Sequence, residues 1–233
     1  MQQRTLTVRR LGNLEYGLAL QVQKQTEAAV RDRMQPDTLL LVEHPDVITL
    51  GRRASDNALL ASPEVLAARS IALFETNRGG KATYHGFGQI VGYPVINLSP
   101  DREDVHVYVR DLEEALIRAL ADFGIESFPI KGLTGVHTRQ GKLAAIGVHI
   151  ARWTTTHGFA LNVNTDLSFF NLITPCEGEA VTSMKEVLGR TLPLHDVEDR
   201  IITRFAEVFY MELEDADHQP LFETQLSRTI APV

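Results

Sequence analysis

The sequence predicts a single domain of mixed α/β or α+β fold, in which helices flank a central sheet. Short alternating or apolar runs, which are typical of strands, dominate the middle of the chain. Longer stretches with helical spacing flank these runs. Strands and helices do not alternate regularly along the chain, so we do not expect a doubly wound parallel sheet.

The first half of the chain contains one expected helix among several expected strands. Residues 14–33 place Leu14, Leu18, Val22 and Ala29 near one face of a helix. We expect strands at residues 5–10, 38–43, 47–50, 71–75 and 89–98.

The second half contains the clearest helical pattern, at residues 107–123, where Tyr108, Leu112 and Leu116 share an apolar stripe and Gly124 ends the helix. A hairpin turn is expected at Arg139-Gln140-Gly141. Further strands are expected at residues 128–130, 135–138, 142–151 and 158–163, and helices at residues 182–188 and 197–210.

The length and composition fit one ordinary globular domain. The chain has 233 residues, of which 44% are hydrophobic and 23% charged, and a chain of this length can bury a core without disulfides or metals. We expect one domain over residues 1–233, with residues 212–233 as a loosely attached tail because they are acidic and polar.

The charge and the cysteine content restrict the possible functions. A net charge of −7 argues against binding of nucleic acid or of an anionic membrane, although a local Arg and Lys cluster could still steer an acidic partner. One cysteine, Cys176, permits neither an internal disulfide nor a cysteine metal site, and no metal site is expected. The sequence shows no signal core and no membrane span, so we expect a cytoplasmic protein, and we expect a monomer.

A glycine-rich segment carries the densest group of functional side chains. It reads R-G-G-K-A-T-Y-H-G-F-G-Q from Arg78 to Gln89. Glycines allow a backbone to approach a ligand closely, and functional groups concentrate on such loops. The composition alone fits equally a loop that joins two strands and a ligand site.

Two further residues could carry chemistry. Lys142 begins an apolar strand, where it is either a solvated turn residue or a partly desolvated base. Cys176 stands between Pro175 and Glu177-Gly178, a combination that predicts a turn. A lone cysteine is commonly buried and inert, but a turn position favours a reactive thiol. His85 or His157 could complete a Cys-His pair, or each could hold a loop backbone.

Taken together, these segments resemble the lipoyl(octanoyl) transferase family. The matching motifs run in order from about residue 38 to residue 188, which is most of the chain. They are L-L-L-V-E-H-P ending at Pro45, T-L-G-R-R at 49–53, the glycine-rich segment, Tyr93-Pro94, K-L-A-A-I-G at 142–147, H-G-F-A-L-N-V-N at 157–164, Pro175-Cys176 and V-T-S at 181–183.

The resemblance implies the fold of the catalytic domains of biotin and lipoate protein ligases. It also implies an acyltransferase that moves an octanoyl group from octanoyl-acyl carrier protein to a lysine of a lipoyl domain, in 2-oxoacid dehydrogenases or the glycine cleavage H protein, without a cofactor. By motif position, Cys176 is the acyl-thioester nucleophile and Lys142 its proton-transfer partner. The acyl-substrate pocket would consist of Arg78, Gly79, Gly80, Lys81, Ala82, Thr83, Tyr84, His85, Ala145, Ile146, Gly147, Gly158, Phe159 and Ala160.

The sequence departs from the family pattern at one position. The family usually has glycine directly after the cysteine, whereas this chain has Glu177 there. A carboxylate close to the thiol would oppose thiolate formation. Two other functions remain open on the sequence alone: an ATP-dependent lipoate or biotin ligase of the same fold, and a noncatalytic module that binds lipoyl domains or acyl carriers.

Overall fold

The computed structural model describes residues 4–55, 57–174 and 180–214 and contains two sheets. The larger sheet has eight strands. In spatial order these are β11 (Met211–Leu213), β1 (Arg4–Asn13), β2 (Asp37–Glu43), β6 (Gln89–Val95), β10 (Thr154–Asn162), β9 (Gly141–Ala151), β8 (Leu133–Thr138) and β7 (Phe128–Ile130).

The larger sheet is mixed. Strand β1 pairs in parallel with β2 and with β11, whereas all other neighbours in this sheet run antiparallel. Helices and strands therefore do not form repeated parallel units, which confirms the expected α+β class and excludes a doubly wound sheet.

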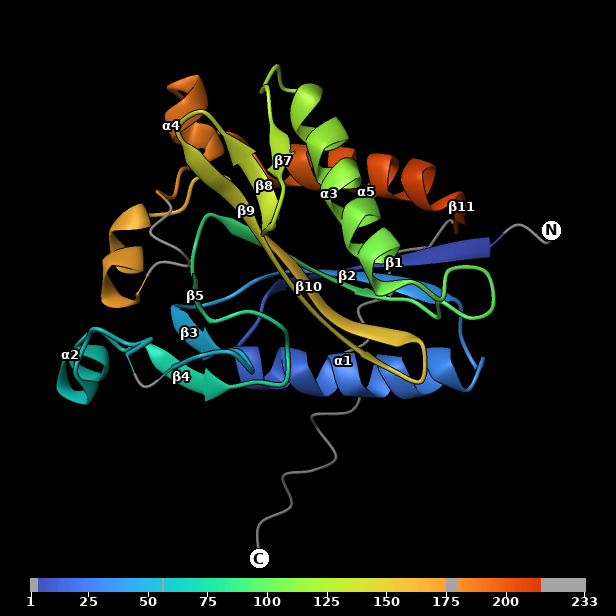
Figure 1. The fold of residues 1–233 in the computed structure, drawn as a ribbon, viewed down its shortest axis with the longest axis horizontal. Helices are drawn as coiled ribbons and strands as arrows, with labels where there is room; N and C mark the ends of the chain where they lie inside the picture. The colour runs from blue at the N-terminus through green and yellow to red at the C-terminus, as the bar shows by residue number, and fades with distance from the viewer. Residues whose placement is uncertain (1–3, 56, 175–179, 215–233) are drawn as a thin grey trace, which may run out of the picture.

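Helices cover both faces of the larger sheet (Figure 1). Helix α1 (Tyr16–Arg31) lies on one face, and α3 (Val105–Ala121) packs with α5 (Leu194–Phe209) on the other. Alternation along β2 shows why: Leu39 and Leu41 join the core under α3 and α5, while Leu40 and Val42 join the core under α1. Successive side chains of a strand point to opposite faces, so this continuous apolar run is buried on both.

A second, three-stranded sheet lies beside the first (Figure 1). Its order is β4 (Ala72–Glu75), β3 (Val47–Leu50) and β5 (Ala82–His85). The short helix α2 (Pro63–Ala68) and the 3-10 helix Leu167–Leu172 pack here, and their apolar side chains form a separate core around Ile48 and Tyr84.

The structure corrects several element boundaries. The glycine-rich segment is not only a loop, because Ala82–His85 forms β5 and pairs with β3. Strand β10 begins at Thr154, four residues before the expected start, because Arg152 and Trp153 turn the chain with φ values of 50° and 60°. Glycine or asparagine usually occupies such positions, so the turn gives no local signal. Glu212 and Leu213, expected in the tail, belong to β11.

Candidate active site

A cavity of about 480 Å³ lies between the two sheets. Strands β6, β9 and β10 of the larger sheet line one side, and the loops and strand β5 of the smaller sheet line the other. The predicted pocket residues that line it are Arg78, Gly80, Lys81, Ala82, Thr83, His85, Ala145, Ile146, Gly147, Gly158, Phe159 and Ala160, together with Lys142.

The floor of the cavity is built from small residues in cross-strand register. Ala145 lies opposite Ala160, and Gly147 lies opposite Gly158. A Cβ atom on Gly147 would lie only 2.8 Å from the carbonyl oxygen of Gly79. The glycine-rich loop can therefore rest directly on β9, where the Gly79 N–H donates to the carbonyl of Val148 at 2.9 Å.

Arg78 holds the glycine-rich loop against strand β3. Its side chain is buried, with 8% exposure. The guanidinium donates from Nη2 to the carbonyl oxygen of Thr49 at 2.7 Å and to Thr49 Oγ1 at 2.9 Å, and from Nη1 to Gly79 O at 2.9 Å. These charge-assisted bonds fix the loop to the strand.

Two predicted pocket residues do not line the cavity. Gly79 contacts β9 through its backbone, as described above. Tyr84 points to the opposite side of β5 from His85, where its ring stacks on Phe169 at 4.9 Å and its hydroxyl donates to Asp46 Oδ1 at 2.7 Å. Neighbouring residues on a strand face opposite ways, so Tyr84 supports the smaller core instead of the cavity.

Hydrogen bonds fix which ring nitrogen of His85 carries the hydrogen, and burial keeps the ring neutral. Gln89 Nε2 donates to the backbone carbonyl of Tyr84 at 3.1 Å, which orients the Gln89 amide. Gln89 Oε1 lies 2.8 Å from His85 Nδ1 and must accept the hydrogen carried there. Burial, the largest cause, lowers the pKa of His85 to about 3, so the imidazole is neutral at physiological pH and Nε2 carries a lone pair.

The hydrogen bonds of His85 belong to a longer row of polar side chains in which each donor faces an acceptor. Thr49 Oγ1 accepts from Arg78, so its own hydrogen can point to His85 Nε2 at 3.5 Å. Beyond His85, Gln89 Nε2 donates to Asn162 Oδ1 at 2.9 Å. Each polar side chain in this buried row therefore has a partner of the correct kind.

A layer of aromatic side chains closes the inner end of the cavity. The Tyr16 ring from α1 stacks on His85, with the ring centroids 6.2 Å apart. His44 bonds Leu14 O and the Tyr93 hydroxyl at 2.7 Å each. Burial lowers the pKa of His44 to about 4. These rings are uncharged near neutral pH and suit an apolar ligand.

His157 also lines the cavity, where its Nε2 lies 2.8 Å from Asn77 Oδ1. Burial and, secondly, the charge of Arg78 lower the pKa of His157 to about 4. The backbone N–H of His157 donates to Gln23 Oε1 at 3.0 Å. His157 thus connects β10 to α1 and to the loop before Arg78. This fits a structural role for His157, the alternative to a Cys-His pair.

Lys142 lines the cavity at the start of β9, and its backbone binds the segment that follows the cysteine. The Lys142 N–H donates to Ala180 O at 2.8 Å, and Thr182 N–H donates to Lys142 O at 3.0 Å. Asn162 Nδ2 donates to Thr182 O at 3.1 Å. Cys176 itself lies outside the described residues, as does Glu177; the described chain stops at Thr174 and resumes at Ala180.

The space beside the Lys142 side chain depends on Gly135. This residue has a φ of 130°, and a Cβ atom there would lie 2.5 Å from Ala144 O and 3.4 Å from Lys142 Cε. The buried Glu113 of α3 accepts a hydrogen bond from the Gly135 N–H at 3.0 Å. Helix α3 thereby fixes the strand that lies next to Lys142.

Sequence reasoning missed several residues of this site. Thr49, Gln89 and Asn162 join the hydrogen-bonded row, and Tyr16 and His44 shape the inner end. All five are separated in sequence and show no local spacing pattern, although all except Tyr16 fall within motifs quoted above. Only the tertiary fold brings them together, because Thr49 lies in the smaller sheet, Gln89 and Asn162 lie in the larger one, and Tyr16 lies on α1.

Two other features of the described residues bear on function. No group of three or more His, Cys, Asp or Glu side chains is placed to share a metal ion in this part of the chain. Within the same ranges, none of the helices has the length and apolar character needed to cross a membrane.

Comparison with known proteins agrees with this architecture. A solved lipoate-protein ligase A bound with ATP superposes with a TM-score of 0.73 at 17% identity, covering 94% of this chain and 90% of that chain. A biotin protein ligase from Aquifex aeolicus, solved with biotin and ATP, gives a TM-score of 0.54 at 13% identity, covering 87% of this chain and 69% of that chain. These similarities show the fold alone and confirm the fold expected from the motifs.

The sequence comparisons are more specific. A curated protein of Solibacter usitatus named octanoyltransferase is 49% identical over 211 residues, which cover 90% of this chain and 96% of that protein. The family pattern described as the lipoyl protein ligase A/B catalytic domain matches residues 15–206. The expected lipoyl(octanoyl) transferase resemblance is confirmed, and the chain belongs to the lipoyl protein ligase A/B catalytic domain family.

Proposed function

We propose that this protein is an octanoyltransferase that moves an octanoyl group from octanoyl-acyl carrier protein to a lysine of a lipoyl domain through an acyl-Cys176 thioester. The acceptors would be lipoyl domains of 2-oxoacid dehydrogenases and the glycine cleavage H protein. The 49% identity to a protein named octanoyltransferase supports the reaction class. The protein would act as a monomer in the cytoplasm.

One observation carries the mechanism. Lys142 lines the cavity whose floor is formed by small apolar residues. Its backbone is hydrogen-bonded to Ala180 and Thr182, which follow Cys176 by four and six residues. On the other side, Thr174 N–H donates to Ala58 O at 2.9 Å. The cavity is lined by Ala180 and by Ile173, the residue before Thr174, so the described chain reaches the cavity on both sides of Cys176. This supports a Cys176–Lys142 pair.

The first half-reaction would transfer the acyl group to the enzyme. The Cys176 thiol gives its proton to Nζ of Lys142, and the thiolate attacks the carbonyl carbon of the octanoyl thioester. The carbon–sulfur bond to the carrier then breaks, and the departing carrier sulfur takes the proton from the Lys142 ammonium. The products are octanoyl-Cys176, neutral Lys142 and the free carrier thiol.

The second half-reaction would form the amide. The neutral amine of the lipoyl-domain lysine attacks the octanoyl-Cys176 carbonyl and passes a proton to neutral Lys142. The bond to Cys176 breaks, which regenerates the thiolate beside the Lys142 ammonium. The donor thioester is already activated, and the amide product is more stable than the thioester. The two half-reactions therefore require no ATP.

The cavity would hold the octanoyl chain on its apolar side. Val91, Phe159 and Ala160 line it and are buried, and removal of apolar surface from water drives the binding of an alkyl chain. The uncharged His85 avoids placing an imidazolium cation against that chain. Lys142 lies near the start of β9. An octanoyl chain on the apolar side of the cavity would therefore place its thioester carbonyl near Lys142 and Cys176.

The decisive experiment is intact-protein mass spectrometry after mixing the protein with octanoyl-acyl carrier protein in the absence of ATP. One octanoyl adduct that maps to Cys176 and disappears when a lipoyl domain is added would establish the relay. Cys176→Ser serves as the control. A protein that stays unmodified, but attaches free octanoate to the lipoyl domain when ATP is present, would instead be an ATP-dependent ligase of the same fold.

A further inference from the structure

The charged side chains that line the cavity are all basic. They are Arg53, Arg78, Lys81 and Lys142, and no Asp or Glu of the described residues joins them. The whole chain, in contrast, has a net charge of −7. A cationic cavity in an acidic protein indicates that part of the ligand is anionic.

These four basic residues differ in the contacts that hold them. The Arg78 guanidinium is buried and donates to Thr49, and Lys142 is the proposed proton-transfer partner of Cys176. Arg53 and Lys81 are different, because neither takes part in an ion pair with any of the described residues. Arg53 is exposed and Lys81 is half-buried, so both lie at the open side of the cavity.

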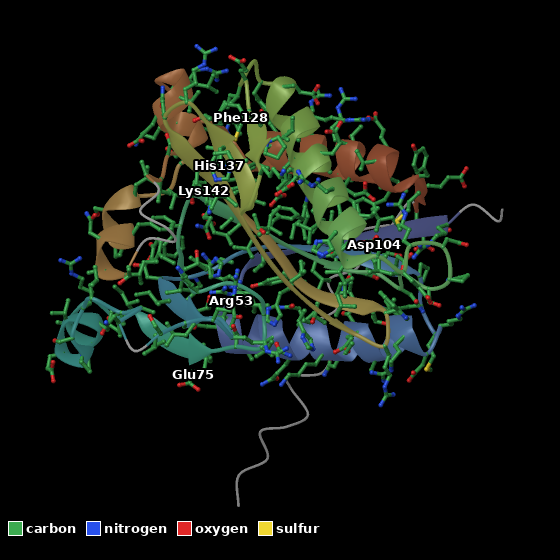
Figure 2. All side chains as sticks on the ribbon, viewed as in Figure 1. Arg53, Glu75, Asp104, Phe128, His137 and Lys142 are labelled. Atoms are coloured by element: carbon green, nitrogen blue, oxygen red, sulfur yellow. The ribbon has the colours of Figure 1, made fainter. Side chains whose placement is uncertain are left out.

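Backbone hydrogen bonds bring Arg53 and Lys81 together from two loops. Gly51 N–H donates to Lys81 O at 2.9 Å, and Arg53 N–H donates to Gly80 O at 3.0 Å. A Cβ atom on Gly51 would lie 2.6 Å from Gly80 O, so glycine is required for the loops to meet. Figure 2 shows Arg53 beside the smaller sheet and Lys142 on β9 of the larger one.

We propose that Arg53 and Lys81 form a phosphate subsite for the arm of the thioester donor, and this rests on the proposed function. An acyl carrier protein presents its acyl group on a phosphopantetheine arm, which is apolar at the acyl end and anionic at the phosphate end. The cavity has the same order, because its apolar lining is buried and Arg53 and Lys81 lie at its open side. Arginine and lysine both bind phosphate oxygens through charge-assisted hydrogen bonds.

Donors with and without the phosphate test this subsite. The measurement is kcat/KM for octanoyl-phosphopantetheine divided by kcat/KM for octanoyl-pantetheine. In the unmodified protein this ratio should be about ten or more, which is the preference that one or two charge-assisted contacts supply. In the double variant Arg53→Ala and Lys81→Ala the ratio should fall towards one.

Arg52 provides a matched control, since it is exposed and adjacent to Arg53 but does not line the cavity. Arg52→Ala removes the same charge and should preserve the ratio. A ratio near one in the unmodified protein, or an equal fall in Arg52→Ala, would overturn the subsite. So would a dependence on Arg53 and Lys81 that appears only with the intact carrier protein, because its acidic surface would then be the group recognised.

Direct binding separates this proposal from the transfer reaction. Calorimetry with free phosphopantetheine and free pantetheine needs no acyl transfer. Tighter binding of phosphopantetheine that is lost in the double variant supports the subsite even if Cys176 is never acylated, in which case the proposed function alone fails. Equal binding of the two compounds, together with normal acylation of Cys176, rejects the subsite and leaves the function intact.

Discussion

Asn162 donates a hydrogen bond from Nδ2 to the carbonyl oxygen of Thr182 at 3.1 Å. Thr182 in turn donates its N–H to Lys142 O at 3.0 Å, so one buried side chain of β10 holds the segment that pairs with Lys142. The Asn162 amide also accepts from Gln89, which connects this segment to His85. The backbone beside Lys142 is therefore attached to the opposite side of the cavity.

Asn162→Asp should impair the chemistry more than the binding of the donor. A carboxylate cannot donate to Thr182 O, so the segment around Thr182 and Lys142 should shift. Misplacement of reacting groups by about 1 Å can cost about a hundredfold. We expect kcat to fall about ten- to hundredfold while KM for the octanoyl donor changes little, and the rate of Cys176 alkylation should follow a different pH profile.

Asn164→Asp is the control for this substitution. Asn164 Oδ1 accepts from the Leu192 N–H at 3.0 Å, and Asn164 Nδ2 donates to Leu192 O at 2.8 Å. The same chemical change therefore also removes a side-chain hydrogen bond to the backbone, but at a position that does not hold Lys142. Unfolding midpoints of both variants give the loss of stability. Equal losses of kcat in the two variants would show that Asn162 acts only through the fold.

Gly147→Ala should displace the glycine-rich loop from the floor of the cavity. The added Cβ would lie 2.8 Å from Gly79 O and 3.3 Å from Arg78 Cδ, and overpacking of this kind costs about 1–3 kcal/mol. We expect a higher KM for the donor and a lower unfolding midpoint. Gly17→Ala in α1, whose Cβ would have only ordinary contact with Phe74 at 3.6 Å, should retain KM; an unchanged KM in Gly147→Ala would contradict the loop argument.

Much of this architecture follows from local patterns in the sequence. The stripe around Tyr108 and Leu112 predicted α3, and the apolar run at Leu39 to Val42 predicted a strand, which the structure buries on both faces of the sheet. The turn at Arg152-Trp153 could not be predicted, because these residues adopt positive φ values that the surrounding strands impose. For the site, the motif order indicated Lys142 and the glycine-rich loop. The row from Thr49 to Asn162 depends on pairing between distant strands, which has no local signature.

Buried histidines should make the protein less stable in mild acid. His44, His85 and His157 have pKa values lowered by burial to about 4, 3 and 4, against about 6.5 in the unfolded chain. Below pH 6.5 the unfolded chain binds protons that the folded protein does not, so the free energy of unfolding decreases as the pH falls from 6.5 towards 4. Each histidine contributes at most about 1.4 kcal/mol per pH unit.

Denaturant unfolding measured between pH 4 and pH 8 tests this dependence. His44→Gln should reduce the slope of the free energy of unfolding against pH, whatever its effect on stability at pH 8. The exposed His106 supplies the control, and His106→Gln should leave the slope unchanged. A slope that is the same in all three proteins would show that His44 does not contribute to it.

Lys142→Arg should separate proton transfer from charge at the proposed Cys176–Lys142 pair. Arginine keeps the positive charge but remains protonated in proteins, so it can stabilise a Cys176 thiolate without accepting a proton. Thiolate formation, measured as the pH dependence of Cys176 alkylation, should persist in Lys142→Arg and weaken in Lys142→Met. Octanoyl transfer to the lipoyl domain should fall at least about a hundredfold in both variants. Near-normal transfer by Lys142→Arg would mean that Lys142 acts through its charge, and the lysine of the acceptor would then lose its proton to another group or to water.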